Sequence, residues 1–251
     1  MDITFLGTGT STGVPEIGCQ CEVCTSTDKR DWRLRTSVLV ETAGKRILLD
    51  CGPDFRWQVI KNRTYHLDAV LISHEHYDHV GGLDDLRPFC REKGVDIFAE
   101  DYVAEAIETR MPYAFRTHRY PGVPNLELHR ITDQPFMAAG LQVIPIRVMH
   151  GKLPIFGYRI GNMAYITDVK YLPEEEYAKL EGLDLLILTA LRKGPHPTHE
   201  SLEEALANIE RIRPKESYLI HMSHRIGLHA EVEKELPPHV HLAYDGLHVS
   251  C

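Results

Sequence analysis

Residues 69–82 read AVLISHEHYDHVGG, and this stretch decides the fold class. Its first four residues, Ala69 to Ile72, form an apolar run typical of a buried strand. Four potential metal ligands follow within six residues, and without a cation they would repel one another or remain unsatisfied. Imidazole and carboxylate together suit zinc, manganese or iron, whereas calcium prefers oxygen alone. The stretch therefore predicts a metal site with the ligands His74, His76, Asp78 and His79.

The spacing of these ligands suggests two ions. His74 and His76 are two residues apart and can point to one side, while Asp78 and His79 lie past a turn and can serve a second ion. The alternative is a hydrophilic loop with incidental histidines. We favour the metal site because His-x-His-x-Asp-His is far more specific than a lone His-x-His.

The rest of the chain predicts a layered α/β protein, with strands first and then strands alternating with helices. Since nothing resembles a linker, we expect one domain over residues 1–251. We expect strands at 3–6, 37–41, 46–49, 69–72, 96–98, 126–131, 141–148, 156–160, 163–166, 184–188 and 217–220, and helices at 53–62, 83–93, 103–110, 173–180, 201–213 and 230–235.

Composition narrows the partners and the compartment. Twenty-eight basic against thirty-six acidic residues give a formal charge of -8, whereas proteins that grip long nucleic acids usually present a basic surface. No apolar run approaches the roughly 18 residues that a membrane helix needs. The start, MDITFLG, lacks the basic segment of a signal peptide. We therefore expect a cytoplasmic protein that binds neither membrane nor long nucleic acid.

A cysteine cluster predicts a further metal site. Cys19, Cys21 and Cys24 form Cys-x-Cys-x-x-Cys, which in a reducing compartment indicates zinc rather than a disulfide. Three thiolates leave tetrahedral zinc one ligand short. His224, near the end of the chain, can supply the fourth. The alternative is three incidental free thiols.

The stretch from His74 to His79 resembles the metal-binding signature of the metallo-β-lactamase superfamily, whose fold is the αββα four-layer sandwich. This resemblance implies further ligands that follow strands downstream, and His150, Asp168 and His221 match them. It also implies that Asp50, in Leu-Leu-Asp-Cys-Gly, orients the ligand loop without binding metal. One ion would then be held by His74, His76 and His150 and the other by Asp78, His79 and His221, with Asp168 shared.

The cysteine loop narrows the resemblance. Following Gly7-Thr8-Gly9 and combined with His-x-x-His near the end of the chain, it resembles the PhnP family over nearly the whole length, residues 6–246. Those proteins are phosphodiesterases that act on cyclic phosphates of ribose. The resemblance implies two catalytic divalent ions (manganese or zinc), a metal-bridged hydroxide as nucleophile, and a structural zinc held by the three cysteines and His224. The expected substrate is a small or cyclic phosphodiester.

His199, just before the helix expected at 201–213, resembles the proton donor of the PhnP and ribonuclease Z families. A phosphodiester needs its leaving alkoxide protonated, and histidine suits this near neutral pH. The alternative is a surface-loop histidine, and His196 is a weaker candidate for the same role. We expect His199 and Asp78 to be catalytic residues, Asp78 in addition to its role as a ligand.

Other functions are less well supported. Gly7-x-Gly9-x-x-x-Gly13 hints at dinucleotide binding, but Pro15 and the cysteines follow it instead of a helix. A ribonuclease Z-like nuclease would share the ligands, yet we find no glycine- and lysine-rich arm between His79 and His221. A thioester or lactone hydrolase and a non-catalytic metal-binding protein on the same fold remain as alternatives, and a homodimer is compatible with all of them.

Overall fold

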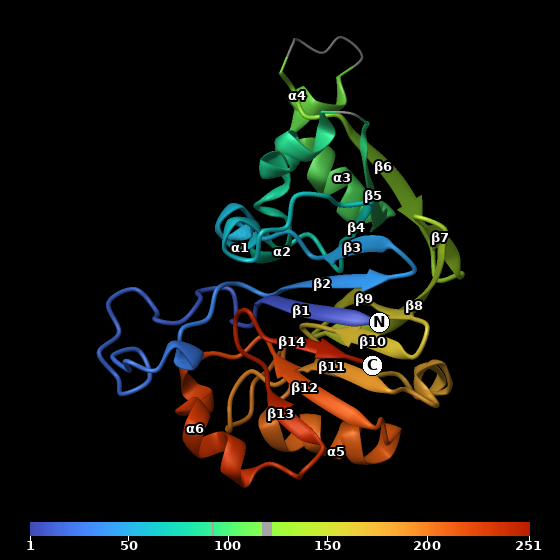
Figure 1. Cartoon of the computed structure of the whole chain (residues 1–251). Coiled ribbons are helices and arrows are strands. Elements are labelled where there is room, and N and C mark those ends of the chain that lie inside the picture. Colours follow the sequence, from blue (N-terminus) through green and yellow to red (C-terminus); the bar gives the residue numbers. More distant parts are fainter. Residues whose placement is uncertain (92, 117–121) are drawn as a thin grey trace.

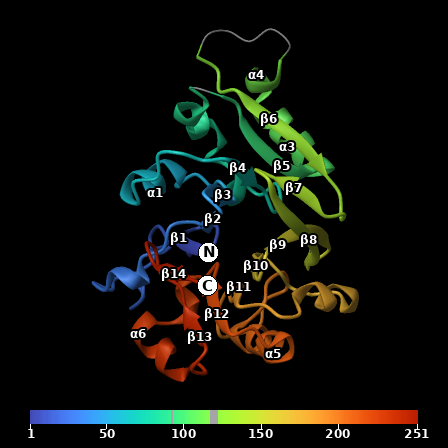
Figure 2. The same ribbon diagram turned by 45° about the vertical axis from the view of Figure 1, so that its right-hand side comes forward.

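Two seven-stranded sheets pack face to face in the computed structural model, which describes residues 1–91, 93–116 and 122–251. Helices α1 to α4 lie on the N-terminal half, while α5 and α6 cover the outer face of the second sheet (Figures 1 and 2). This arrangement is the predicted αββα sandwich. The two sheets have the strand orders β14-β1-β2-β3-β4-β5-β6 and β13-β12-β11-β10-β9-β8-β7.

The first sheet begins as an antiparallel meander and continues, from β3 to β6, as parallel strands. Its strands are β1 (Asp2–Gly7), β2 (Ser37–Thr42), β3 (Lys45–Leu49), β4 (Ala69–Leu71), β5 (Val95–Glu100), β6 (Leu126–Ile131) and β14 (His248–Ser250). The helices of this half are η1 (Lys29–Asp31), α1 (Phe55–Lys61), α2 (Tyr77–Val80), η2 (Leu83–Cys90), α3 (Asp101–Arg110) and α4 (Pro112–Phe115), where η denotes a 3-10 helix.

The second sheet is antiparallel from β7 to β10 and parallel from β10 to β13. Its strands are β7 (Phe136–Ala138), β8 (Leu141–His150), β9 (Leu153–Ile160), β10 (Met163–Ile166), β11 (Leu185–Thr189), β12 (Glu216–Ile220) and β13 (Val240–Leu242). Its helices are η3 (Glu174–Leu180), α5 (Leu202–Ile212), η4 (His224–Ile226), α6 (His229–Val232) and η5 (Glu233–Glu235).

Side-chain alternation along the strands creates three apolar layers. Because successive strand residues face opposite sides, Leu49 packs between the sheets while its neighbour Leu48 packs under the helices of the first half. On the other side, the apolar face of α5 packs on the second sheet, and a capping box between Ser201 and Glu204 fixes the start of that helix. Both halves therefore share one central layer.

The structure corrects several expected elements. The segments predicted as helices at 83–93 and 173–180 contain 3-10 helices, and Pro88 inside η2 removes an amide donor that an α-helix would need there. Strands β7, β13 and β14 were not predicted, because each has only three residues and no long apolar run. None of the helices in the described ranges is both long and apolar enough to span a membrane.

The parallel strands bring distant residues to one edge of the sandwich. Asp50 follows β3, Asp168 follows β10 by one residue, and His221 follows β12. All three have left-handed backbone conformations, with φ of 60°, 54° and 56° respectively. Such angles are uncommon outside glycine and concentrate at functional sites. This edge is therefore the place to look for chemistry.

The central layer predicts a clear stability effect. Ile187, on β11, is fully buried between the sheets. Ile187→Ala should lower the free energy of unfolding by about 2–5 kcal/mol, because it leaves a cavity in a packed core. Ile17→Ala is the control, since Ile17 is 97% exposed and its loss should change stability by about 0.5 kcal/mol or less. Urea denaturation of both variants tests this, and equal effects would contradict the core assignment.

Candidate metal centre

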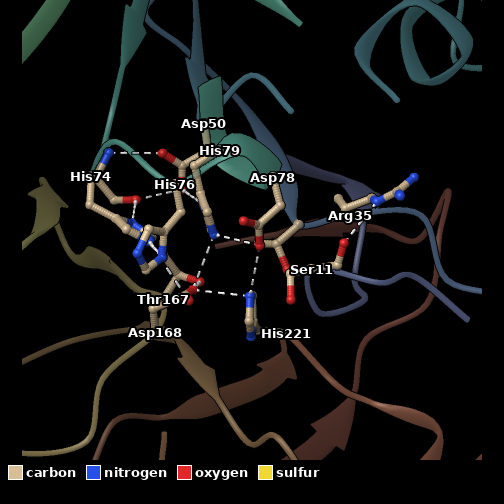
Figure 3. Close-up of polar contacts among 12 residues, drawn as sticks. Ser11, Arg35, Asp50, His74, His76, Asp78, His79, Thr167, Asp168 and His221 are labelled. Atoms are coloured by element: carbon tan, nitrogen blue, oxygen red, sulfur yellow. Dashed lines mark hydrogen bonds and ion pairs between the residues drawn. The ribbon is translucent and has the colours of Figure 1, made fainter. Parts of the chain in front are cut away.

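The residues expected to bind the catalytic ions meet at the shared edge in two groups. In each group the potential ligand atoms lie within 4.8 Å of one another. Figure 3 shows the six labelled ligand candidates of this edge converging from both halves of the molecule. The first group is His74, His76, His150 and Asp168, and the second is Asp78, His79, Asp168 and His221. The structure thus brings together the two sets of residues expected from the sequence.

Asp168 belongs to both groups and faces them with different oxygens. Its Oδ1 lies 3.1 Å from Nε2 of His221 and 3.3 Å from Nε2 of His79. Its Oδ2 lies 3.9 Å from Nε2 of His74. Thr189 fixes the backbone, because its Oγ1 accepts a hydrogen bond from the Asp168 amide at 2.6 Å. The carboxylate thus has the orientation that a bridge between two cations requires.

Asp50 fixes the ligand loop, residues 73–79, at both of its ends. Its carboxylate accepts hydrogen bonds from the backbone amide and the hydroxyl of Ser73, at 2.8 and 2.9 Å. It also accepts from Nδ1 of His79 at 2.8 Å and from the hydroxyl of Tyr165 at 2.7 Å. With its Nδ1 proton committed to Asp50, the His79 ring presents Nε2 to the centre. Asp50 thus has the position expected of an orienting residue.

Two further histidines are held in a similar way. Nδ1 of His150 lies 2.8 Å from the carbonyl oxygen of Thr198, so it donates there and leaves Nε2 free for a ligand. The Ser73 hydroxyl gives its proton to Asp50 and can accept one from Nδ1 of His74, 3.0 Å away. Such partners fix the tautomer of a ligating histidine. The sequence analysis missed Ser73, Tyr165 and Thr198, and only the position of Ser73 directly after a strand could have suggested one of them.

The donor set fits divalent cations. Nε2 of His79 is buried and has no hydrogen-bond partner within the described chain, although it lies 3.2 Å from Oδ2 of Asp78. Nε2 of His74 and Nδ1 of His76 are only 2.9 Å apart. With the His74 proton on Nδ1, these two nitrogens are arranged to share one cation. Mixed nitrogen and carboxylate ligands suit zinc, manganese or iron.

Electrostatics also demand positive charge here. Burial disfavours the ionised Asp168 carboxylate, but His221 and His79 hold its pKa well below the usual range. Burial likewise disfavours a charged His79, yet Asp78, Asp168 and Asp50 raise the pKa of its ring well above the usual value. Buried carboxylates at this density are stable only when paired with cations.

His199 lies beside both groups without joining either. Its ring stacks on that of His221, with centroids 5.0 Å apart, and lies 4.6 Å from that of His150. Its Nδ1 is 3.8 Å from Oδ2 of Asp168. Burial lowers the pKa of His199 to about 3, so the ring is neutral near pH 7. This differs from the expectation of a histidine ready to donate near neutral pH, and an acid role would require a bound anion to raise its pKa.

The cysteine cluster is assembled as the sequence analysis expected. The Sγ atoms of Cys19, Cys21 and Cys24 lie 3.1, 3.4 and 3.4 Å from Nδ1 of His224. Tetrahedral zinc, with Zn–S of about 2.3 Å and Zn–N of about 2.0 Å, separates such atoms by about 3.5 Å. Nε2 of His224 points instead to Glu16, 3.5 Å away. The four residues thus fit one structural zinc.

A third cluster was not foreseen. Asp96 and Glu127, on neighbouring strands, lie near His129. Nε2 of His129 is 2.6 Å from Oδ1 of Asp96, and both side chains are partly exposed. Since the two groups satisfy each other directly and water reaches them, this cluster needs no ion.

Comparison with known proteins identifies the family. The profile of the beta-lactamase superfamily domain matches residues 45–222, well over half of the chain. The chain belongs to this superfamily. It is 39% identical to the crystal structure of a diphosphatase from the PhnP family, with a TM-score of 0.93 over 99% of this chain and 96% of the other. The predicted fold and the PhnP-like relationship are therefore confirmed.

This chain matches only part of the length of two curated relatives. The octanoyltransferase of Porphyromonas gingivalis is 51% identical over 250 residues, which is 98% of this chain but 51% of that protein. The ribonuclease Z of Thermosynechococcus vestitus is 28% identical over 174 residues, 64% of this chain and 36% of the other. The chain thus spans about half the length of the octanoyltransferase and less than half the length of the ribonuclease Z.

The zinc assignment yields a first test. Cys21→Ser should lower the zinc content by about one ion per chain and lower the melting temperature, because structural zinc contributes folding free energy. Cys251→Ser, at an exposed cysteine, is the matched control and should change neither. Elemental analysis and thermal denaturation measure both quantities. Unchanged zinc and unchanged melting in the Cys21 variant would refute the assignment.

The Asp50 network yields a second test. In Asp50→Asn, the side-chain amide group would face the four groups that now donate hydrogen bonds to the carboxylate, and the His79 ring would lose its support. Asp50→Asn should therefore weaken binding of the catalytic metals by about 10–100-fold. Competition with a chelator measures the affinity. Asp54→Asn, which alters an ion pair with Arg35, is the control and should have little effect. A native fold with unaltered affinity in the Asp50 variant would contradict the orienting role.

Proposed function

We propose that this chain is a binuclear metal-dependent hydrolase that cleaves small phosphoesters, with phosphodiesters as the preferred class. The carrying observation is the position of Asp168, whose two oxygens face two separate groups of ligands. When bound, two divalent ions would activate water and stabilise the charge that develops on a phosphoryl group. This chemistry suits a substrate that carries negative charge.

The residues of the chain have distinct tasks in this proposal. Asp50, Ser73 and the Thr198 carbonyl fix the rings of the ligands, so the metal-binding atoms are preorganised before substrate arrives. Asp78 and Asp168 would compensate the positive charge of the ions. His199 lies beside both groups with an uncommitted Nδ1. A phosphate anion bound next to it would raise its pKa and let it protonate the leaving oxygen.

The comparisons support this class at different levels. The PhnP-family relative with 39% identity is a diphosphatase, which makes a phosphoanhydride the second candidate substrate. The octanoyltransferase relative is about twice as long as its matched region, so its activity does not transfer to this chain. A ribonuclease Z-like activity is less well supported because of the acidic charge balance, -8 overall. We further propose a cytoplasmic protein without a membrane or long nucleic acid partner.

A substrate panel tests the proposed class. With manganese, zinc or iron supplied separately, we expect turnover of bis-(p-nitrophenyl) phosphate and of cyclic ribose phosphates. Phosphomonoesters, precursor transfer RNA and octanoyl thioesters should be poor substrates. Faster turnover of diphosphates than of diesters would favour the phosphoanhydride. Efficient and specific cleavage of precursor transfer RNA, or turnover of the thioester alone, would refute the proposal.

The proton-donor role of His199 has its own test. His199→Ala should keep the metal content and lower kcat for an alkyl phosphodiester by about 10²–10⁴-fold, the range for a lost general acid. The loss should be smaller for a p-nitrophenyl ester, because that leaving group needs little protonation. His196→Ala is the control, since His196 neighbours this ring at 5.1 Å between centroids. An equal loss on both esters would indicate positioning, and loss of metal would make His199 a ligand.

A further inference from the structure

A groove lies between the segments at residues 12–17 and 29–35 and helix α1. Its volume is about 490 Å³, within the range of small-molecule sites. Trp32 and Trp57 both line it and remain 44% and 58% exposed. They are the two tryptophans of the chain. Large flat rings that line a hollow are suitable surfaces for stacking an aromatic group.

The same groove carries positive charge on an acidic protein. Lys29, Arg35 and Lys61 line it, although the chain as a whole has a charge of -8. Nζ of Lys29 lies 3.8 Å from the ring centroid of Trp32. Lys61 forms no side-chain hydrogen bond or ion pair with any described residue. The aromatic and cationic groups therefore occur together, and Lys61 is available to an anion.

The carboxylates of the groove do not cancel this charge. Asp54 already binds the guanidinium of Arg35, at 3.0 Å. Asp245 turns inward and accepts hydrogen bonds from the Thr8 hydroxyl at 2.8 Å and from the Leu34 amide at 2.7 Å. The free charge of the lining is thus positive, and an anionic ligand is favoured.

Arg35 lies on the side of the groove that is nearer to the metal centre. Its Nε donates a hydrogen bond to the carbonyl oxygen of Ser11, 3.1 Å away. Figure 3 shows Ser11 and Arg35 on the Asp78 side of the centre. Thr12, the next residue, already lines the groove. The groove therefore begins one residue away from Ser11, on the Asp78 side of the metal centre.

We propose that this groove binds the base and a phosphate of a nucleoside phosphate, which forms the non-reacting part of the substrate. The base stacks on Trp57, and phosphate oxygens bind Lys61 and Lys29, whose ammonium lies over the Trp32 ring. The inference rests on the proposed function for its role in catalysis, but the binding itself can be measured without turnover. It narrows the substrate class from any small phosphoester to one that carries an aromatic base.

Tryptophan fluorescence of the metal-loaded protein tests the proposal directly, because both tryptophans line the groove. AMP is the probe, with ribose 5-phosphate (no base) and adenosine (no phosphate) as matched controls. We expect a saturable change of emission with AMP, weaker binding of adenosine, and no change with ribose 5-phosphate.

Variants assign the binding to named side chains. Trp57→Ala should weaken AMP binding about tenfold, the effect of losing one stacking partner, with Trp32 still reporting. Lys61→Ala should weaken AMP binding but leave adenosine binding unchanged. Tyr65→Ala is the control, since Tyr65 is 77% exposed and lines a different hollow, with Pro88 and Phe89.

Three outcomes would overturn the proposal: no saturable change with AMP, equal binding of ribose 5-phosphate, or full AMP affinity in the Trp57 variant. A dimer that Trp57→Ala dissociates, with no response to AMP, would assign the groove to a second copy of the chain. If AMP fails to bind while phosphodiesters are hydrolysed, only this inference is wrong. If AMP binds but no phosphoester is hydrolysed, the groove stands and the proposed function fails.

Discussion

The buried carboxylate of Asp50 is the interaction on which the rest of the site depends. It lies at the end of β3, yet its partners come from the ligand loop after β4 and from β10 in the opposite sheet. One side chain therefore ties the two halves of the sandwich together at the point where the ligands converge. Its oxygens accept four hydrogen bonds, so it is satisfied without a metal and can act as a fixed support.

Next to Asp50, the fold buries charged side chains that proteins normally keep exposed to water. Asp78, Asp168 and three of the histidines around them, His74, His79 and His221, are almost fully buried. The left-handed backbone at Asp168 and His221 is a cost that the surrounding strands impose. Bound cations would neutralise the buried carboxylates and give each buried ligand atom a partner. The free energy of this binding would offset the backbone strain. The same reasoning applies to the cysteine loop, which has little apolar core of its own and is folded around four side chains that could hold a metal ion.

The sequence predicted the sites whose residues lie close together in the chain. His-x-His-x-Asp-His and the cysteine motif each indicate a site within a few residues. The long apolar runs predict most strands. His150, Asp168 and His221 needed the family resemblance, since a single residue after a strand carries little information. Tyr165 and the Trp32–Trp57 groove could not be foreseen, because they exist only through tertiary contacts between distant segments. The edge strands β7, β13 and β14 were missed for a related reason: three residues gain their structure from pairing with a neighbour, not from their own pattern.

The central claim is that Asp168 joins two metal ions in one centre. Native mass spectrometry of the metal-loaded protein and of Asp168→Ala tests it most directly, with circular dichroism to verify that the variant is folded. We expect three metal ions per wild-type chain, two in this centre and one in the cysteine loop. In Asp168→Ala we expect that only the cysteine-loop zinc is retained. A folded variant that keeps all three ions with undiminished occupancy would contradict the account.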